Sequence, residues 1–140
     1  MNNSNLHLMR LYLFGLLLFV FTSCLYMRKP PDLIASPSKH FILKVEINSD
    51  KSDETKYGCV VLTLYDTSNK EISTFQTGAS NCMKWAVNWY PTKDTIILYS
   101  SDIGNRAYHL TDKNQLDTIS VTKEMDSIAK IIFDKKYAKQ

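Results

Sequence analysis

Residues 82–110 read CMKWAVNWYPTKDTIILYSSDIGNRAYHL, and this stretch decides the fold. It holds three runs rich in aromatic and β-branched residues, CMKWAVNWY, TIILYSS and RAYHL, separated by the polar turns PTKD and DIGN. The first run alternates, which places Trp85 and Trp89 on one face and Lys84 and Tyr90 on the other. Runs of this composition joined by tight turns predict consecutive antiparallel strands.

The turn DIGN predicts its own backbone geometry. Gly104 is expected to take a positive φ, because tight hairpin turns need that conformation and glycine adopts it without steric cost. Asp102 is expected to accept a hydrogen bond from the backbone N–H two residues on, as turn aspartates do. Both residues therefore have a structural interpretation.

Strand signals continue on both sides of this stretch. HFILKVEIN (40–48) alternates strictly, and CVVLTLYD (59–66) is apolar on both faces, which indicates a central strand. EISTFQT (71–77) and LDTISV (116–121) add two more strands. The sequence therefore predicts a mostly β (α+β) domain, a single antiparallel β-sandwich or curled meander of about six or seven strands.

A C-terminal amphipathic helix is expected to follow the strands. Thr122 is a good N-cap, and the acidic residues Glu124 and Asp126 suit the positive end of a helix dipole. An apolar stripe with helical spacing follows, formed by Met125, Ile128, Ala129 and Ile132. Such a stripe normally packs on its own domain.

The N-terminus has the three parts of a secretory signal. A short polar segment ends at Arg10, an unbroken apolar run spans residues 11–21, and the small residues Thr22 and Ser23 lead into Cys24. This arrangement resembles the lipobox of bacterial lipoproteins, although Phe21 stands where Leu, Val or Ile is commoner. The resemblance implies cleavage before Cys24 and lipidation of its thiol, and thus an anchor in the inner or outer membrane of a bacterial envelope, with the domain in the periplasm or at the cell surface.

These boundaries divide the chain into a signal peptide (1–23), a lipidated cysteine with a Pro-rich tether (24–38) and a β-rich domain with its helix (39–140). Two alternatives to the lipoprotein remain open. An uncut transmembrane helix over residues 11–27 would be at the short end of the length needed to cross a bilayer, and plain secretion would leave no anchor.

Composition excludes some classes of function. The 17 basic and 14 acidic residues are nearly balanced and evenly spread, so there is no basic stripe for nucleic acid. His40 and His109 are solitary, with no metal-ligand spacing around them, and no cofactor is expected. Ser100, Ser101, Asp102 and His109 could be written as a catalytic set, but no nucleophile elbow accompanies them, so we expect no enzyme.

Cys59 and Cys82 allow two interpretations. A disulfide is consistent with an oxidising compartment, whereas two inert, buried thiols are equally consistent with the sequence. If both cysteines head strands that are two apart in a meander, they would lie roughly 10 Å apart, too far for a bridge.

Residues 89–110, WYPTKDTIILYSSDIGNRAYHL, resemble one blade segment of the TolB-type β-propeller. Trp89, Pro91, Asp102, Gly104 and Tyr108 match that repeat in kind, while Lys93 and Asp94 replace its usual Asp-Gly. Because the segment occurs once, the resemblance implies only a local strand–turn–strand arrangement, and no function follows from it.

The aromatic residues supply the candidate binding site. One interpretation is core packing; the other is a binding surface of six residues, Trp85, Trp89, Tyr90, Tyr99, Arg106 and Tyr108. The expected function is a membrane-tethered, non-enzymatic protein-binding module. Such a module could be an immunity or inhibitor protein that neutralises a toxin, or an accessory subunit of an envelope complex. The alternative is a lipoprotein that binds a small ligand or glycan on its aromatic face.

Overall fold

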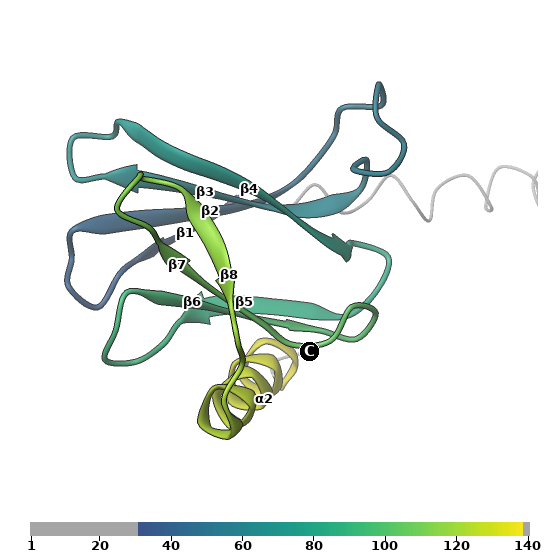
Figure 1. Cartoon of the computed structure of the whole chain (residues 1–140). Coiled ribbons are helices and arrows are strands. Elements are labelled where there is room, and N and C mark those ends of the chain that lie inside the picture. The colour runs from purple at the N-terminus through teal and green to yellow at the C-terminus, as the bar shows by residue number, and fades with distance from the viewer. Residues whose placement is uncertain (1–30, 139–140) are drawn as a thin grey trace, which may run out of the picture. The chain divides into compact units, whose positions relative to one another are not determined.

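The computed structural model describes residues 31–138, so the predicted signal peptide and Cys24 lie outside the described residues. Residues 31–138 form two antiparallel four-stranded sheets and a C-terminal helix (Figure 1). The first sheet contains β1 (Asp32–Ala35), β2 (Phe41–Ile47), β3 (Cys59–Asp66) and β4 (Glu71–Ser80). The second contains β5 (Trp85–Trp89), β6 (Thr95–Ser100), β7 (Arg106–Leu110) and β8 (Leu116–Ile119), and α2 (Lys123–Tyr137) follows it.

Strand order in each sheet follows the sequence, β1-β2-β3-β4 and β5-β6-β7-β8. The expected mostly β fold with a C-terminal helix is therefore confirmed, as two stacked meanders with one strand more than the upper expectation. In the second sheet Trp89 pairs with Ile96, and Ile96 in turn pairs with Tyr108. The stretch from which the fold was inferred thus forms three adjacent strands.

The additional strand is β1, which lies inside the segment predicted as a tether. Asp32 pairs with Val45 and Ala35 with Ile42 along β2. Pro31 and Pro37 flank the strand without interrupting it, and prolines are tolerated at strand ends and edges. Residues 32–35 of the segment expected to be a tether therefore form an edge strand, in which Ile34 packs against the inner core while Leu33 is exposed.

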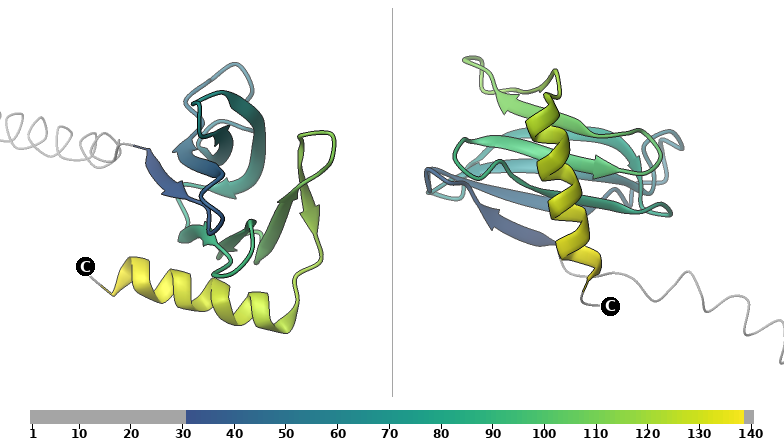
Figure 2. Two further views of the ribbon diagram at one scale, coloured as in Figure 1. Left: turned by 90° about the vertical axis from the view of Figure 1, so that its left-hand side faces the viewer. Right: turned by 90° about the horizontal axis from the view of Figure 1, so that it is seen from below.

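The sheets share one core, and the second sheet has another core on its outer face. The inner core contains Leu43, Val45, Val60, Leu62, Leu64, Ala79, Trp89, Ile96, Leu98, Tyr108 and Leu116. On the outer face, which α2 covers (Figure 2), sheet and helix enclose a separate cluster formed by Tyr90, Ile97, Ala107 and Ala129. Burial of both faces of β6 explains why its sequence, TIILYS, is apolar without alternation.

Contacts at the sheet edges hold the sandwich closed. The indole Nε1 of Trp89 donates to the carbonyl oxygen of Ile34 at 3.0 Å, which joins β5 to β1. On the opposite side, the backbone N–H of Leu116 donates to Ser73 Oγ at 2.9 Å, which joins β8 to β4. Each of these two hydrogen bonds therefore joins an edge strand of one sheet to an edge strand of the other.

The helix begins and packs as the sequence predicts. The Thr122 side chain accepts a hydrogen bond from the N–H of Met125, and Ala129 is fully buried against the sheet. The view from below shows α2 lying across the strands (Figure 2). Among residues 31–138, no helix has both the length and the apolar character needed to cross a membrane.

The turn after β6 differs in part from the expectation. Gly104 has the expected positive φ, 75°. Asp102, however, accepts from the N–H of Ser80 at 2.9 Å and of Ile103 at 3.0 Å, and also from the Ser100 hydroxyl. The aspartate therefore joins its turn to the end of β4, in the other sheet, as well as bonding locally.

The end of β4 also corrects the expected position of Cys82. The strand runs to Ser80, beyond the expected stop at Gly78, and Cys82 lies in the short turn before β5. Cys59 pairs directly with Ser80, because β3 and β4 are neighbours. The expected separation of two strands between the cysteines was therefore wrong.

Candidate functional site

The six aromatic and arginine residues predicted as one surface occupy three separate places. Trp89 and Tyr108 belong to the inner core, and Trp85 packs at its margin. Tyr90 and Tyr99 lie in the outer core beneath α2. Arg106 is exposed at the start of β7. The structure thus brings these residues into one sheet but not onto one surface.

Burial accounts for most of this set. Tyr108 is 1% exposed and its ring packs on Phe75 with centroids 4.9 Å apart. Removal from water raises the pKa of Tyr108 to about 12, because the phenolate is the form that burial disfavours. Its ring therefore has a structural role between the sheets.

The two tyrosines of the outer face contact the helix. The Tyr90 hydroxyl donates to Glu124, and this hydrogen bond is the main cause that raises the pKa of Tyr90. Tyr99 packs on Phe133 with ring centroids 4.2 Å apart. Both side chains therefore fix α2 in place and are partly covered by it.

The ring of Trp85 lies against a lysine near the end of the helix. Lys136 Nζ lies 3.2 Å from the centroid of its ring, and Lys84 Nζ lies 5.6 Å from the ring centroid of Tyr137. The side chain of Met83 beside them is 48% exposed. We call this cluster, formed by Met83, Lys84, Trp85, Lys136 and Tyr137, the Trp85 corner.

The corner is built by the end of α2 against the first residue of β5. Tyr137 Oη accepts from the Trp85 N–H at 3.3 Å and donates to the Trp85 carbonyl oxygen at 3.1 Å. Lys136 Nζ donates to the same carbonyl oxygen at 2.8 Å. Since β5 is an edge strand, these bonds occupy backbone groups that no neighbouring strand reaches.

Chemically, the corner combines an apolar surface with ammonium groups. Tryptophan, tyrosine and methionine are enriched in the centres of protein interfaces, and nearby cations steer an acidic partner. The indole N–H of Trp85 has a hydrogen-bond partner, since Nε1 donates to Asn81 Oδ1 at 3.4 Å. This arrangement can bind an acidic and partly apolar protein surface.

Sequence reasoning selected Trp85 but missed the other four residues of the corner. The sequence placed Lys84 on the strand face opposite Trp85, and it gave the helix only a packing role through its apolar stripe. The contact between residues about fifty positions apart has no local sequence signal. Lys136 comes close to the Trp85 ring only when the end of α2 packs against β5.

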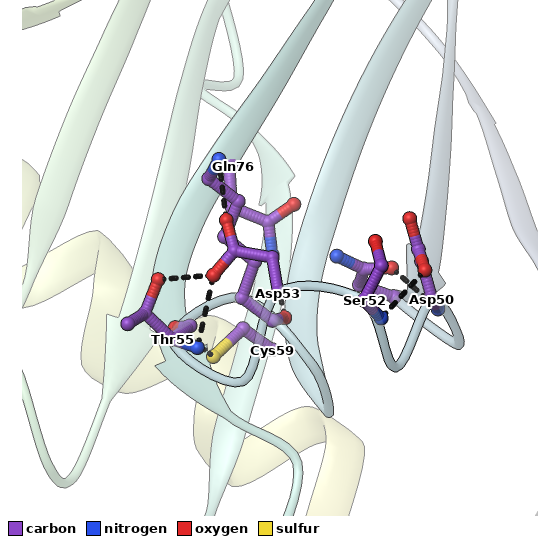
Figure 3. Close-up of polar contacts among 8 residues, drawn as sticks. Asp50, Ser52, Asp53, Thr55, Cys59 and Gln76 are labelled. Atoms are coloured by element: carbon purple, nitrogen blue, oxygen red, sulfur yellow. Dashed lines mark hydrogen bonds and ion pairs between the residues drawn. The ribbon is translucent and has the colours of Figure 1, made fainter.

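The loop at residues 48–58 holds a second polar cluster, which is satisfied internally (Figure 3). Asp50 accepts from the N–H of Ser52, while Asp53 accepts from both the N–H and the hydroxyl of Thr55. Bonds to Lys56 first and Thr55 second lower the pKa of Asp53 to about 2. These carboxylates shape the loop, and within residues 31–138 no group of three or more His, Cys, Asp or Glu is arranged to hold a metal ion.

The serine, aspartate and histidine types noted in the sequence do not assemble. Asp102 follows β6, whereas His109 pairs with Thr95 at the other end of that strand. Asp102 instead bonds Ser80, Ser100 and Ile103, as described above. Asp102 therefore joins the turn after β6 to the end of β4 in the other sheet.

Comparison with known proteins gives no match: no protein-family model, curated protein or solved structure matches this chain.

Proposed function

We propose that this chain is a lipid-tethered, non-enzymatic protein-binding module of the bacterial envelope, and that it acts as an immunity protein against a toxin. The observation that carries the proposal is the Trp85 corner, where Met83 is exposed, Lys136 Nζ lies over the half-buried ring of Trp85, and Lys84 Nζ lies over the ring of Tyr137. The lipobox-like segment ending at Cys24 supports the tether. An anchored domain intercepts an arriving protein at the membrane.

The chemistry of the corner favours a partner with an acidic, partly apolar surface. Lys84 is exposed and supplies positive charge at the rim, which speeds encounter with an acidic protein. Met83 and Trp85 supply the apolar area that resists dissociation. The attraction between Lys84 and an acidic partner weakens as salt concentration rises, because exposed charges are screened.

The glycan-binding alternative has less support. A sugar-binding platform needs aromatic rings exposed in a row, yet Trp89 is 6% exposed and its Nε1 is bonded to Ile34. Trp85 lies on the same face of the strand but is half-buried beneath Lys136. An exposed ridge of two tryptophans is therefore not available for stacking.

The experiment is a competition between bacterial strains. A strain that lacks this gene is grown against its own parent, which delivers the toxin, and is complemented with wild-type or variant chains. We expect the deletion strain to be outcompeted and wild type to restore survival. Cys24→Ala is expected to lose protection and to leave the membrane fraction, while Lys84→Glu is expected to weaken protection with normal fractionation.

The matched control is Lys113→Glu, which makes the same charge change in the β7–β8 turn. That turn lies at the opposite end of the second sheet from Trp85, so protection should be unchanged. Equal growth of the deletion strain and its parent would contradict the immunity role. Full protection with Cys24→Ala, together with unchanged fractionation, would contradict the tether.

A further inference from the structure

The pairing of β3 with β4 brings the two cysteines of the described domain to one end of one sheet. Cys59 lies opposite Ser80, and the next pair outward is joined by the Asn81 N–H donating to the Gly58 carbonyl oxygen at 2.8 Å. Cys82 is the following residue of the chain. The two cysteines therefore lie at the same end of the β3–β4 pair, Cys59 as the first residue of β3 and Cys82 two residues after the end of β4.

Local structure gives the thiols different environments. Cys59 is half-buried, and its Sγ lies 3.9 Å from the Thr55 carbonyl oxygen and 4.0 Å from that of Tyr57. Cys82 is exposed in a tight turn closed by the Met83 N–H, which donates to the Ser80 carbonyl oxygen at 3.1 Å. An incoming reagent therefore reaches Cys82 first, and Cys59 is placed to resolve the product.

We propose that Cys59 and Cys82 form a thiol–disulfide site whose co-reactant is a disulfide-bearing oxidant. The Cys82 thiolate attacks one sulfur of the oxidant, forming a mixed disulfide and releasing one thiolate, which takes up the proton that Cys82 lost. The Cys59 thiolate then attacks Sγ of Cys82 and releases the second thiol. The protein loses two protons and two electrons, and the oxidant, which gains them, is reduced to two thiols.

The exposed turn allows this closure. A disulfide needs Cα atoms within about 7 Å, so closure requires the turn to hold Cys82 within that distance of Cys59. Residues 81–84 are exposed, and the turn can move without disturbing the core. The closed bond would fasten the turn that carries Met83 and Lys84 to the start of β3.

The test uses the full chain with Cys24→Ser, purified in detergent, which leaves Cys59 and Cys82 as its two cysteines. The reduced protein is incubated with glutathione disulfide at several protein concentrations, alkylated and analysed by intact mass. We expect a monomer lighter by about 2 Da that resists alkylation, formed at a rate independent of protein concentration. Its Tm should exceed that of the reduced protein by more than about 5 °C.

Single-thiol variants separate the two roles. Cys59→Ser should stop at the mixed disulfide with glutathione, because the resolving thiol is missing. Cys82→Ser should react at least tenfold more slowly, because Cys59 is less accessible. A disulfide-linked dimer as the main product, or a stable mixed disulfide in the chain that keeps both thiols, would overturn the proposal, and neither outcome bears on toxin binding.

Discussion

Trp85 and Trp89 lie on the same face of one strand, yet their positions in the fold give them different roles. Trp89 is part of the inner core and bonds to β1, whereas Trp85 lies at the margin where helix and sheet meet. At the scale of single residues, alternation determines which face a side chain takes but not how deeply that face is buried at each position.

Trp89→Ala should destabilise the domain by about 3–5 kcal/mol, because it removes a core ring and one hydrogen bond. Trp85→Ala should cost clearly less, because part of that ring already contacts water. Urea unfolding of the two variants beside wild type measures the difference. Equal losses of stability would show that the corner is as much a part of the core as Trp89.

Asp102→Asn should lower the free energy of unfolding by more than about 1 kcal/mol. The amide oxygen can replace one carboxylate oxygen as acceptor, but the amide nitrogen would face a backbone N–H or hydroxyl donor at the position of the other oxygen. Asp112→Asn, which makes the same change at an exposed position of the β7–β8 turn, is the control and should retain most of the stability.

Asp102 also makes a testable contribution to pH dependence. Burial raises its pKa, but hydrogen bonds from Ser100, Ser80 and Ile103 outweigh burial, and its pKa in the folded protein lies below the usual value. The carboxylate therefore stabilises the fold above the unfolded-state pKa, and this contribution is lost as pH falls through the folded-state pKa. Between about pH 5 and pH 3, wild type should lose more stability than Asp102→Asn; parallel curves would contradict this role.

At the scale of elements, side chains occupy exposed backbone groups on the edge strands. Tyr137 and Lys136 occupy the N–H and carbonyl of Trp85, Asn88 Oδ1 accepts from the Trp89 N–H at 2.8 Å, and Asp117 Oδ1 accepts from the Thr118 N–H at 2.7 Å. Unoccupied strand edges pair with other chains. These bonds therefore protect the sandwich from edge-to-edge association.

Tyr137→Phe should reduce stability by about 1 kcal/mol, because it removes both hydrogen bonds to Trp85 while keeping the ring that packs on Phe133. The uncovered edge should also increase self-association, measured by analytical ultracentrifugation at high protein concentration. Ile131→Ser, on the exposed face of α2, is the control. A variant with wild-type stability and association would show that Lys136 alone protects this edge.

At the scale of the whole molecule, the second sheet joins the two cores. Strand β6 gives Ile96 and Leu98 to the inner core and Ile97 to the outer core beneath α2. Both faces of β6 are buried, one in the inner core and one under α2. Detachment of the helix would therefore expose the apolar outer face of the second sheet. The sandwich and the helix should therefore unfold together.

Unfolding followed by tryptophan fluorescence and by far-ultraviolet circular dichroism should give coincident midpoints. Both tryptophans lie in β5 and report on the sandwich, while the helix dominates the dichroism signal at about 222 nm. Ile97→Ala, which opens a cavity in the outer core, should shift both midpoints equally. Loss of the helical signal before the fluorescence change would show that α2 is an independent unit.

The sequence by itself determined the strand-rich class, most strand positions, the helix with its cap, and the positive φ at Gly104. These features depend on periodicity, turn chemistry and capping, which act between residues close in the chain. Only the tertiary structure decided that β1 is a strand, that β4 reaches Ser80, that Asp102 joins two sheets, and that the end of α2 meets Trp85. Each of these depends on contacts between distant segments, whose free energy comes from burial and hydrogen bonding that no local pattern records.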